Sequence, residues 1–440
     1  MNEQVDQDAR AWLESHYNLE TGVGWPANNR RETGPTRDRI EALLRYEGSP
    51  QLEYPAVHLT GTNGKTSTAR MITQLLVDLG LSVGSYTSPH LERVNERISH
   101  QGEPIADSEL DGLLETVSLV ERELDIRPSY FEVLTAAAFR WFADLAVDLA
   151  VVEVGLGGTW DATNCLDTRV ALVTNIAIDH VELLGPTRQR IAADKAGIIQ
   201  PGSTLVLGER DPDLEPIFTK RGPARVFRRD ADFGVRENSL AVGGRLVDLY
   251  TTTRSYSDVL LPLHGAHQAD NAAVAIMAAE AFLGAPLDDD VVRSALTAVR
   301  SPGRLEVVRR SPLVLLDGAH NVAGAEALRA ALDEAFAIGP RTLVIGLLRE
   351  KEPHEMLRAI GIDDAARVLC CRAPSGRALD PEIVAAAARD LGVAEDRLGV
   401  AESVNEAVTT ALLETPDDGQ IVITGSLYVV GAARSMLVRP

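Results

Sequence analysis

The sequence predicts an α/β protein, with a larger N-terminal domain on a mostly parallel sheet and a smaller C-terminal Rossmann-like α/β domain. Two observations support this prediction: short apolar runs alternate with helical patterns along the chain, and a glycine-rich loop separates the first such run from the helix after it. Aromatic residues make up 5% of the chain, which favours helix-rich layers over a sandwich of short aromatic strands. Such alternation is typical of a parallel sheet covered by helices on both faces.

The elements of the N-terminal domain follow from the spacing of its apolar residues. A helix is predicted from Lys65, with apolar residues on one face and Gly80 as its stop. Residues 225–262 combine short runs, glycines and polar alternation, which predicts an antiparallel insert, and an alanine-rich helix follows at 271–283. The predicted strands are 56–60, 149–154, 170–176 and 204–208.

The segment Arg300–Gly303, Arg-Ser-Pro-Gly, interrupts this pattern, and a second α/β series follows it. We therefore expect one domain over residues 1–299, with an N-terminal helical lead-in, and another over 300–440. In the second domain a helix is predicted from about Ala323. Its predicted strands are 313–316, 342–347 and 420–424.

The net charge of −21 limits the possible partners. A surface this acidic repels phosphate backbones, so we expect no nucleic acid and no anionic membrane as a partner. Cys165, Cys370 and Cys371 cannot all pair, and no apolar run reaches the roughly 18–20 residues of a membrane span. Residues 1–30 lack the apolar core of a signal peptide. We expect a soluble cytoplasmic protein and, without an apolar stripe for self-association, a monomer.

The run Gly61-Thr62-Asn63-Gly64-Lys65-Thr66-Ser67 lies between a predicted strand and a predicted helix. Glycines let backbone amides converge on phosphate oxygens, and the helix N-terminus adds partial positive charge. Lys65 supplies a mobile cation for the outer phosphates of ATP, and Thr66 or Ser67 can reach Mg²⁺. We interpret this domain as P-loop ATPase-like; a plain glycine-rich turn is the alternative. The spacing is compressed, since position 59 is Leu rather than Gly, and it resembles that of the Mur ligase superfamily.

Nine further segments follow in order along the chain: Tyr86–Leu91, Asn95–Ile98, Tyr130–Thr135, Glu153–Gly158, Asp161–Asn164, Ile178–Gly185, Lys195–Ile199, Asp317–Asn321 and Thr424–Tyr428. With the loop they resemble the folylpolyglutamate synthase and dihydrofolate synthase family, from about residue 37 to residue 431. The resemblance implies ATP-dependent ligation of L-glutamate to folate, and also to dihydropteroate. It implies an acyl-phosphate intermediate and release of ADP and phosphate.

The resemblance also implies a metal site. Ser88, Glu153 and His180 are expected to bind Mg²⁺ near the phosphates. From the residues alone, Glu153 could instead cap its strand, His180 could be structural, and Ser88 could be a turn residue before proline. Lys195 stands where this superfamily often carries an N-carbamylated lysine, which gives Mg²⁺ a second carboxylate. A salt bridge is the alternative for Lys195.

Four residues resemble ATP contacts on both sides of the domain boundary, namely Asn271, Arg304, Asp317 and His320. By the same resemblance Lys65, Lys195, Arg304 and His320 take part in catalysis. Arg304 follows the predicted hinge, so it would reach the phosphates only when the domains close. Its alternative role is a salt bridge in the linker.

Phe131 and Asp161 match positions that hold a pteroate ring in bifunctional members of the family. An aromatic face can stack on a pterin, and a carboxylate can accept hydrogen bonds from its N–H groups. The alternatives are core packing for Phe131 and a loop cap for Asp161. Ser426 and Tyr428 are expected to help hold the incoming glutamate, with a buried strand end as the alternative.

The sequence departs from the family motifs at two places, and two alternatives to a folate ligase remain. Thr66 replaces a glycine common in folate ligases, and Thr159-Trp160 replaces a commoner Arg-Leu, which removes one cation near the substrate. A cell-wall precursor ligase is disfavoured because the phosphate loop begins at residue 61, leaving little chain for a UDP-sugar domain before it. A non-catalytic ATP-binding switch is disfavoured because a switch needs no second nucleotide-facing motif such as that around Asp317.

Overall fold

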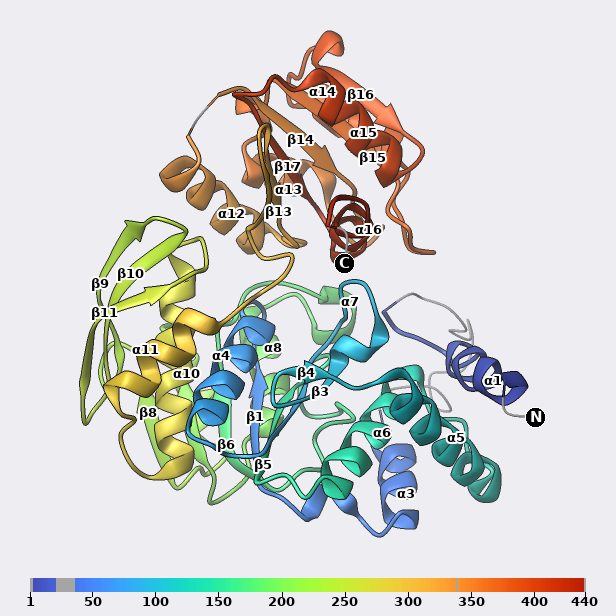
Figure 1. Cartoon of the computed structure of the whole chain (residues 1–440), viewed down its shortest axis with the longest axis vertical. Coiled ribbons are helices and arrows are strands. Elements are labelled where there is room, and N and C mark those ends of the chain that lie inside the picture. The colour runs from blue at the N-terminus through green and yellow to red at the C-terminus, as the bar shows by residue number, and fades with distance from the viewer. Residues whose placement is uncertain (1–2, 21–35, 338, 439–440) are drawn as a thin grey trace. The chain divides into compact units, whose positions relative to one another are not determined.

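The protein is described here from a computed structural model of residues 3–20, 36–337 and 339–438 (Figure 1). Residues 21–30, part of the stretch expected to lack a signal peptide, lie outside these ranges. Tertiary contacts divide the chain into two units. The first comprises Met1–Asn238, Leu246–Leu261 and Ala269–Val299, and the second comprises Ser239–Arg245, Pro262–Gln268 and Arg300–Pro440. In the described ranges, every helix is too short or too polar to cross a bilayer.

The first unit contains an eight-stranded sheet with strand order β4-β3-β2-β5-β1-β6-β7-β8. Strands β3 and β4 pair antiparallel at one edge, and the other six run parallel. The strands are β1 (Ala56–Thr60), β2 (Val83–Tyr86), β3 (Ile98–His100), β4 (Glu103–Pro104), β5 (Leu149–Glu153), β6 (Thr168–Val173), β7 (Thr204–Leu207) and β8 (Arg225–Arg228). The central strands β1 and β5 are buried at every position, which explains their continuous apolar sequence.

The sheet is covered by helices on both faces (Figure 1). Successive side chains of a strand point to opposite faces, so Ala56 and His58 share the face of β1 that belongs to the core of α3, α5 and α6. The helix α4 packs on β2 and β5. The helices are α1 (Glu3–Glu14), α3 (Asp38–Tyr46), α4 (Lys65–Asp78), α5 (Asp107–Leu124), α6 (Tyr130–Asp144), α7 (Val181–Leu184), α8 (Arg188–Lys195), α9 (Glu215–Thr219), α10 (His267–Leu283) and α11 (Asp289–Ala298), with 3₁₀ turns at Pro50–Leu52, Val94–Arg97 and Ala196–Ile198.

The predicted antiparallel insert is found in part. Strands β9 (Gly234–Ala241), β10 (Gly244–Tyr250) and β11 (Ser255–Leu261) form a three-stranded sheet in the order β11-β10-β9. Two residues connect β9 to β10 and four connect β10 to β11, which only antiparallel strands allow. The beginning of the predicted insert differs, because β8 pairs parallel with β7. The helix α9 between them supplies the crossover that a parallel pair needs.

The second unit contains a six-stranded sheet in the order β12-β13-β17-β14-β15-β16, with only β12 antiparallel to its neighbour. Its strands are β12 (Glu306–Arg310), β13 (Leu313–Leu316), β14 (Arg341–Ile345), β15 (Arg367–Cys371), β16 (Leu398–Ala401) and β17 (Gln420–Thr424). Its helices are α12 (Val322–Ala335), α13 (Pro353–Ile360), α14 (Pro381–Asp390), α15 (Val404–Glu414) and α16 (Leu427–Leu437), with 3₁₀ turns at Ile362–Asp364 and Glu395–Arg397. The predicted α/β fold, with a mostly parallel sheet in the first unit and a second α/β unit, is confirmed.

Candidate functional site

The phosphate loop joins β1 to α4 and requires glycine at two positions. Gly61 has φ 151° and Gly64 has φ 81°, in the region that side chains disfavour. A Cβ atom at Gly61 would lie 1.8 Å from Oγ1 of Thr174, and one at Gly64 would lie 2.6 Å from Oδ1 of Asn271. Asn271 is buried on α10, so the structure places this predicted ATP contact directly against the loop.

Two residues that the sequence analysis did not single out hold the phosphate loop in place. The backbone N–H of Thr62 donates to the Asn175 carbonyl (2.9 Å), and the N–H of Asn63 donates to Oδ1 of Asn175 (3.0 Å). The hydroxyl of Thr174 donates to the Asn63 carbonyl (2.7 Å). Both residues directly follow β6, at the carboxyl end of a parallel strand. Because functional residues gather at such strand ends, this position in the sequence could have identified them.

Two lysines converge on one carbonyl oxygen of this loop. Nζ of Lys65 donates to the carbonyls of Gly61 (3.2 Å) and Thr62 (3.1 Å). Nζ of Lys195, at the end of α8, donates to the same Gly61 carbonyl at 2.9 Å. Burial, and secondarily the positive charge of Lys65, lower the pKa of Lys195 to about 7. The structure therefore brings together two predicted catalytic residues that are 130 positions apart in sequence, and one of them loses its proton readily.

A buried acid, Glu153, lies beside the loop, next to the loop residue Thr66 and to Ser88. Glu153 ends β5 and is 1% exposed. The Thr66 hydroxyl donates to its two carboxylate oxygens at 3.2 and 2.9 Å, and the Ser88 N–H approaches Oε2 at 3.4 Å. Carboxylate and hydroxyl oxygens are ligands that Mg²⁺ prefers, so the chemistry of Thr66, Ser88 and Glu153 fits the predicted ion.

His180 is more exposed than Glu153 and Ser88. It precedes α7 with a left-handed φ of 49°, its side chain is 40% exposed, and Nε2 lies 4.0 Å from the Asp179 carboxylate. No group of three or more His, Cys, Asp or Glu side chains that could hold a metal occurs within residues 3–20, 36–337 and 339–438. The predicted metal role of His180 thus remains a prediction.

Phe131 and Asp161 meet at the loop that follows β5. The Phe131 ring covers Gly155, where an added Cβ would lie 2.5 Å from Cζ, and it packs 5.7 Å from the Tyr86 ring. Asp161 is buried and accepts hydrogen bonds from the N–H groups of Leu156 (2.9 Å) and Thr163 (3.0 Å). Burial raises the pKa of Asp161. Its carboxylate therefore caps this loop, and Phe131 takes part in the core while staying half-buried.

In the second unit, three predicted residues gather after β13. The Asp317 carboxylate accepts from the N–H groups of Leu305 and Ala319, both at 2.9 Å, and burial raises its pKa. Nη1 of Arg304 donates to the Gly318 carbonyl at 3.2 Å. Nδ1 of His320 lies 2.9 Å from the same carbonyl, so it carries the proton there. Arg304, Asp317 and His320 thus form one group at the carboxyl edge of this sheet.

The segment after β17 lies against that group. The Gly425 N–H donates to the Ala319 carbonyl at 3.2 Å, and a Cβ at Gly318 would lie 2.5 Å from the Leu427 side chain. Ser426 is 1% exposed and caps α16, because its hydroxyl accepts from the Val429 N–H at 3.3 Å. Tyr428, in the first turn of α16, is half-buried. The Ser426 hydroxyl is therefore engaged in its own helix.

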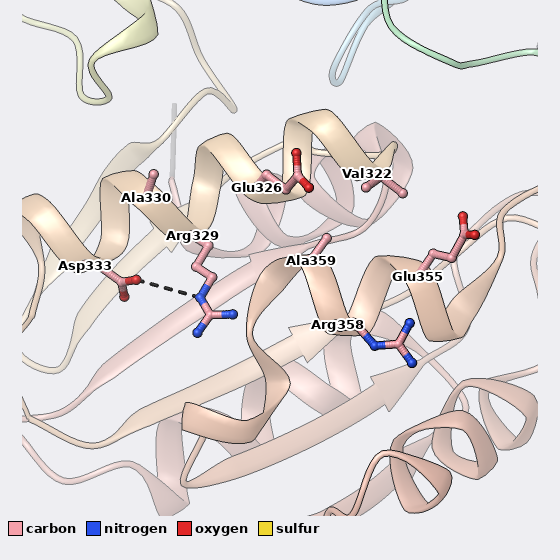
Figure 2. Close-up of a pocket in the computed structure, with 8 residues that line it drawn as sticks. All are labelled: Val322, Glu326, Arg329, Ala330, Asp333, Glu355, Arg358 and Ala359. Atoms are coloured by element: carbon pink, nitrogen blue, oxygen red, sulfur yellow. Dashed lines mark ion pairs between the residues drawn. The ribbon is translucent and has the colours of Figure 1, made fainter. Parts of the chain in front are cut away.

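The second unit also has a surface groove, which is lined by other residues than the predicted site. Figure 2 shows it between α12 and α13, with charged side chains on both helices. Its lining residues are Val322, Glu326, Arg329, Ala330, Asp333, Glu355, Arg358 and Ala359. None of the predicted site residues lines this groove, and Arg329 in it forms an ion pair with Asp333 at 3.7 Å.

Comparisons with known proteins find two domain families along the chain. The Mur ligase middle domain matches residues 59–279, and the Mur ligase glutamate ligase domain matches residues 303–427. The first match contains the phosphate loop, Glu153 and Lys195. The second contains Arg304, Asp317, His320 and Ser426.

Individual relatives match over most of their length. A dihydrofolate synthase/folylpolyglutamate synthase of Mycobacterium tuberculosis is 41% identical, covering 94% of this chain and 92% of the relative. A folylpolyglutamate synthase of Lacticaseibacillus casei is 36% identical, covering 92% of this chain and 95% of the relative. The solved structure of Mycobacterium tuberculosis folylpolyglutamate synthase complexed with ADP matches with TM-score 0.90 and 39% identity over 99% of both chains.

Proposed function

We propose a role for each site residue from the premise that this chain belongs to the folylpolyglutamate synthase/dihydrofolate synthase family of Mur ligases. The enzyme is an ATP-dependent ligase that joins L-glutamate to folate. In the proposed reaction, a substrate carboxylate oxygen attacks the γ-phosphorus of ATP and ADP leaves. The glutamate nitrogen then attacks the acyl carbon, loses a proton, and displaces phosphate as the amide forms. We propose dihydropteroate as a second acceptor.

The observation that carries this proposal is the buried cluster around the phosphate loop. A carboxylate and a phosphate at ~4 Å repel by roughly 4 kcal/mol for each pair of unit charges at an effective dielectric of 20. The attack therefore needs cations, and Lys65 is the cation held over the loop. Thr66, Ser88, Glu153 and His180 would hold Mg²⁺, which when bound neutralises phosphate charge and polarises the γ-phosphoryl group.

We propose that Lys195 reacts with CO₂ to form a carbamate. The ammonium first loses one proton, and the neutral amine then forms the N–C bond and releases a second, so a positive side chain becomes a negative one. Two features support this: the pKa of Lys195 is lowered to about 7, and its Nζ lies 2.9 Å from the Gly61 carbonyl in the loop itself. The carbamate would add an oxygen ligand for Mg²⁺.

The remaining predicted contacts are assigned by their local geometry. Asn271, which touches Gly64, would bind the nucleotide, as would Arg304 and Asp317. His320, whose Nδ1 lies 2.9 Å from the Gly318 carbonyl, would contact a phosphate or a substrate. Tyr428, with the backbone around Ser426, would contact the incoming glutamate.

The other parts of the proposal concern the substrate, the compartment and the assembly. The half-buried Phe131 ring over Gly155 would stack on the pterin of the acceptor. All three cysteines are free thiols, which supports a reducing cytoplasm. We propose that the enzyme acts as a monomer.

Phosphate release from ATP with L-glutamate tests the proposal. Dihydropteroate, a reduced folate and UDP-muramyl peptides are compared as acceptors, and each product is identified by mass. We expect both folate acceptors to stimulate release. Stimulation by reduced folate alone limits the enzyme to one activity, and stimulation by the muramyl peptides makes it a cell-wall ligase. No stimulation by any acceptor leaves only an ATP-binding switch. Lys65→Ala should abolish the signal, while Lys220→Ala, at the end of α9, should not.

A further inference from the structure

A chain of buried polar side chains leads from the centre of the large sheet to the loop beneath Phe131. His58, in the middle of β1, and Thr163 are fully buried, and Asp161 is 6% exposed. Nε2 of His58 lies 2.8 Å from the Thr163 hydroxyl, and that hydroxyl donates to Oδ1 of Asp161 at 2.5 Å. The three residues come from two segments about 100 positions apart in sequence.

The direction of these hydrogen bonds determines the state of the histidine. The single hydroxyl proton of Thr163 goes to the Asp161 carboxylate, so its oxygen can only accept from His58. Nε2 of His58 must therefore carry a proton, and because burial lowers the pKa of His58 to about 3, the ring is neutral and its Nδ1 carries no proton. Its Nδ1 is buried and has no hydrogen-bond partner within the described residues. A buried nitrogen left without a partner is costly, so the sheet retains this histidine at a cost to stability.

Asp161, the last residue of this hydrogen-bonded series, organises a loop that the substrate is proposed to contact. The Asp161 carboxylate also accepts from the Leu156 N–H, one residue after the glycine that the Phe131 ring covers. A second bond from β1 reaches the same loop, because the Thr60 hydroxyl donates to the Gly157 carbonyl at 2.8 Å. The position of residues 155–163 relative to Phe131 thus depends on side chains of β1.

We propose that His58 is a positioning residue for the pterin site: through Thr163 it holds the Asp161 carboxylate, and with it the loop on which the aromatic part of the acceptor lies. It does not touch the substrate. This inference rests on the proposed function for the placement of the acceptor, but the ordering of the loop can be measured without any substrate.

The first test is substrate-free and uses matched variants. The amide of Gln carries its N–H₂ where histidine has Nε2, whereas that of Asn carries it where histidine has Nδ1, so only His58→Gln can still donate to Thr163. In His58→Leu and His58→Asn, the backbone amides of residues 155–163 should exchange their hydrogens about tenfold faster than in wild type. In His58→Gln, their exchange rates should stay close to those of wild type. Val170→Ala, which opens a cavity in the neighbouring strand β6, serves as the control for general loosening. Equal effects of the Gln and Asn variants would overturn the proposal.

The second test is kinetic. His58→Leu should raise the KM for dihydropteroate or folate about tenfold while the KM for ATP stays within about twofold. An equal rise in both constants would mean general damage and would overturn the proposal. Thr163→Val should reproduce the effect on KM. The double variant His58→Leu/Thr163→Val should have the same KM as Thr163→Val alone, because both substitutions interrupt the same series of hydrogen bonds. If wild type ligates neither acceptor, the proposed function fails, while hydrogen exchange still decides whether His58 orders the loop.

Discussion

Replacing Lys195 by methionine tests the buried charge beside the phosphate loop. Methionine keeps most of the length of the side chain but cannot be protonated. Lys195 is 5% exposed, and burial together with Lys65 lowers its pKa from 10.5 to about 7. A lysine that folding makes more acidic destabilises the fold whenever it is charged, so its removal changes how stability depends on pH.

The size of the effect follows from the pKa. At about 1.36 kcal/mol for each pKa unit, ionised Lys195 costs the fold roughly 5 kcal/mol relative to the neutral side chain. Below pH 7 the lysine is protonated in both states, so this cost is constant. Between about pH 7 and pH 10.5 the unfolded chain binds the proton and the folded chain does not, so stability rises with pH. From about pH 6 to about pH 9 wild type should gain roughly 3 kcal/mol that Lys195→Met does not gain.

Urea unfolding in CO₂-free buffer measures this difference. The tryptophans at positions 12, 141 and 160 lie in the first unit, so their fluorescence reports on its unfolding. The free energy of unfolding is compared between wild type and Lys195→Met at several pH values, and titrating groups that do not interact with Lys195 cancel in that difference. A difference that does not change across this pH range would refute the argument that the Lys195 ammonium is desolvated beside Lys65.

Three further outcomes are expected. Gly64→Ala should raise the KM for ATP by about tenfold or more, whereas Gly80→Ala, with a similar φ of 85° and nothing within 4 Å, should cost only about 1 kcal/mol in unfolding experiments. Thr66→Val, which removes the hydrogen bond to Glu153, should lower kcat about tenfold or more, and Thr66→Ser should restore it; equal activity of the two variants would contradict the role of the hydroxyl. Arg304→Ala should slow turnover about tenfold more than it weakens ATP binding measured by calorimetry, and equal losses would contradict a role in the chemical step.

Much of the fold could be predicted because its elements have strong local signals. The strand β1 and the helix α4 match the prediction at Ala56–Thr60 and from Lys65, since a continuous buried strand and a Gly-Lys helix start are each read within a few residues. The strand β8 was misassigned to the insert, because its pairing with β7 depends on the α9 crossover and not on its own four residues.

The sequence predicted which residue types make up the candidate site, but it did not predict most of the contacts between them. Lys65, Glu153 and Lys195 were named from motifs, and the structure gathers them around one loop. Asp161 was named as a substrate contact, which stays a prediction; the structure shows that its carboxylate accepts hydrogen bonds from its own loop. The local sequence around Asp161 carries no sign of this, because one of the residues that orient it, His58, is about 100 positions away.

The sequence by itself therefore determined many of the strands and helices, and it predicted which loop binds phosphate and which side chains carry charge for the reaction. Only the tertiary structure decided that Lys195 reaches the Gly61 carbonyl and that Glu153 accepts from Thr66. The physical reason is the strand order β2-β5-β1-β6. Parallel pairing places the carboxyl ends of strands that are far apart in sequence at one edge, and no local pattern encodes which strands become neighbours.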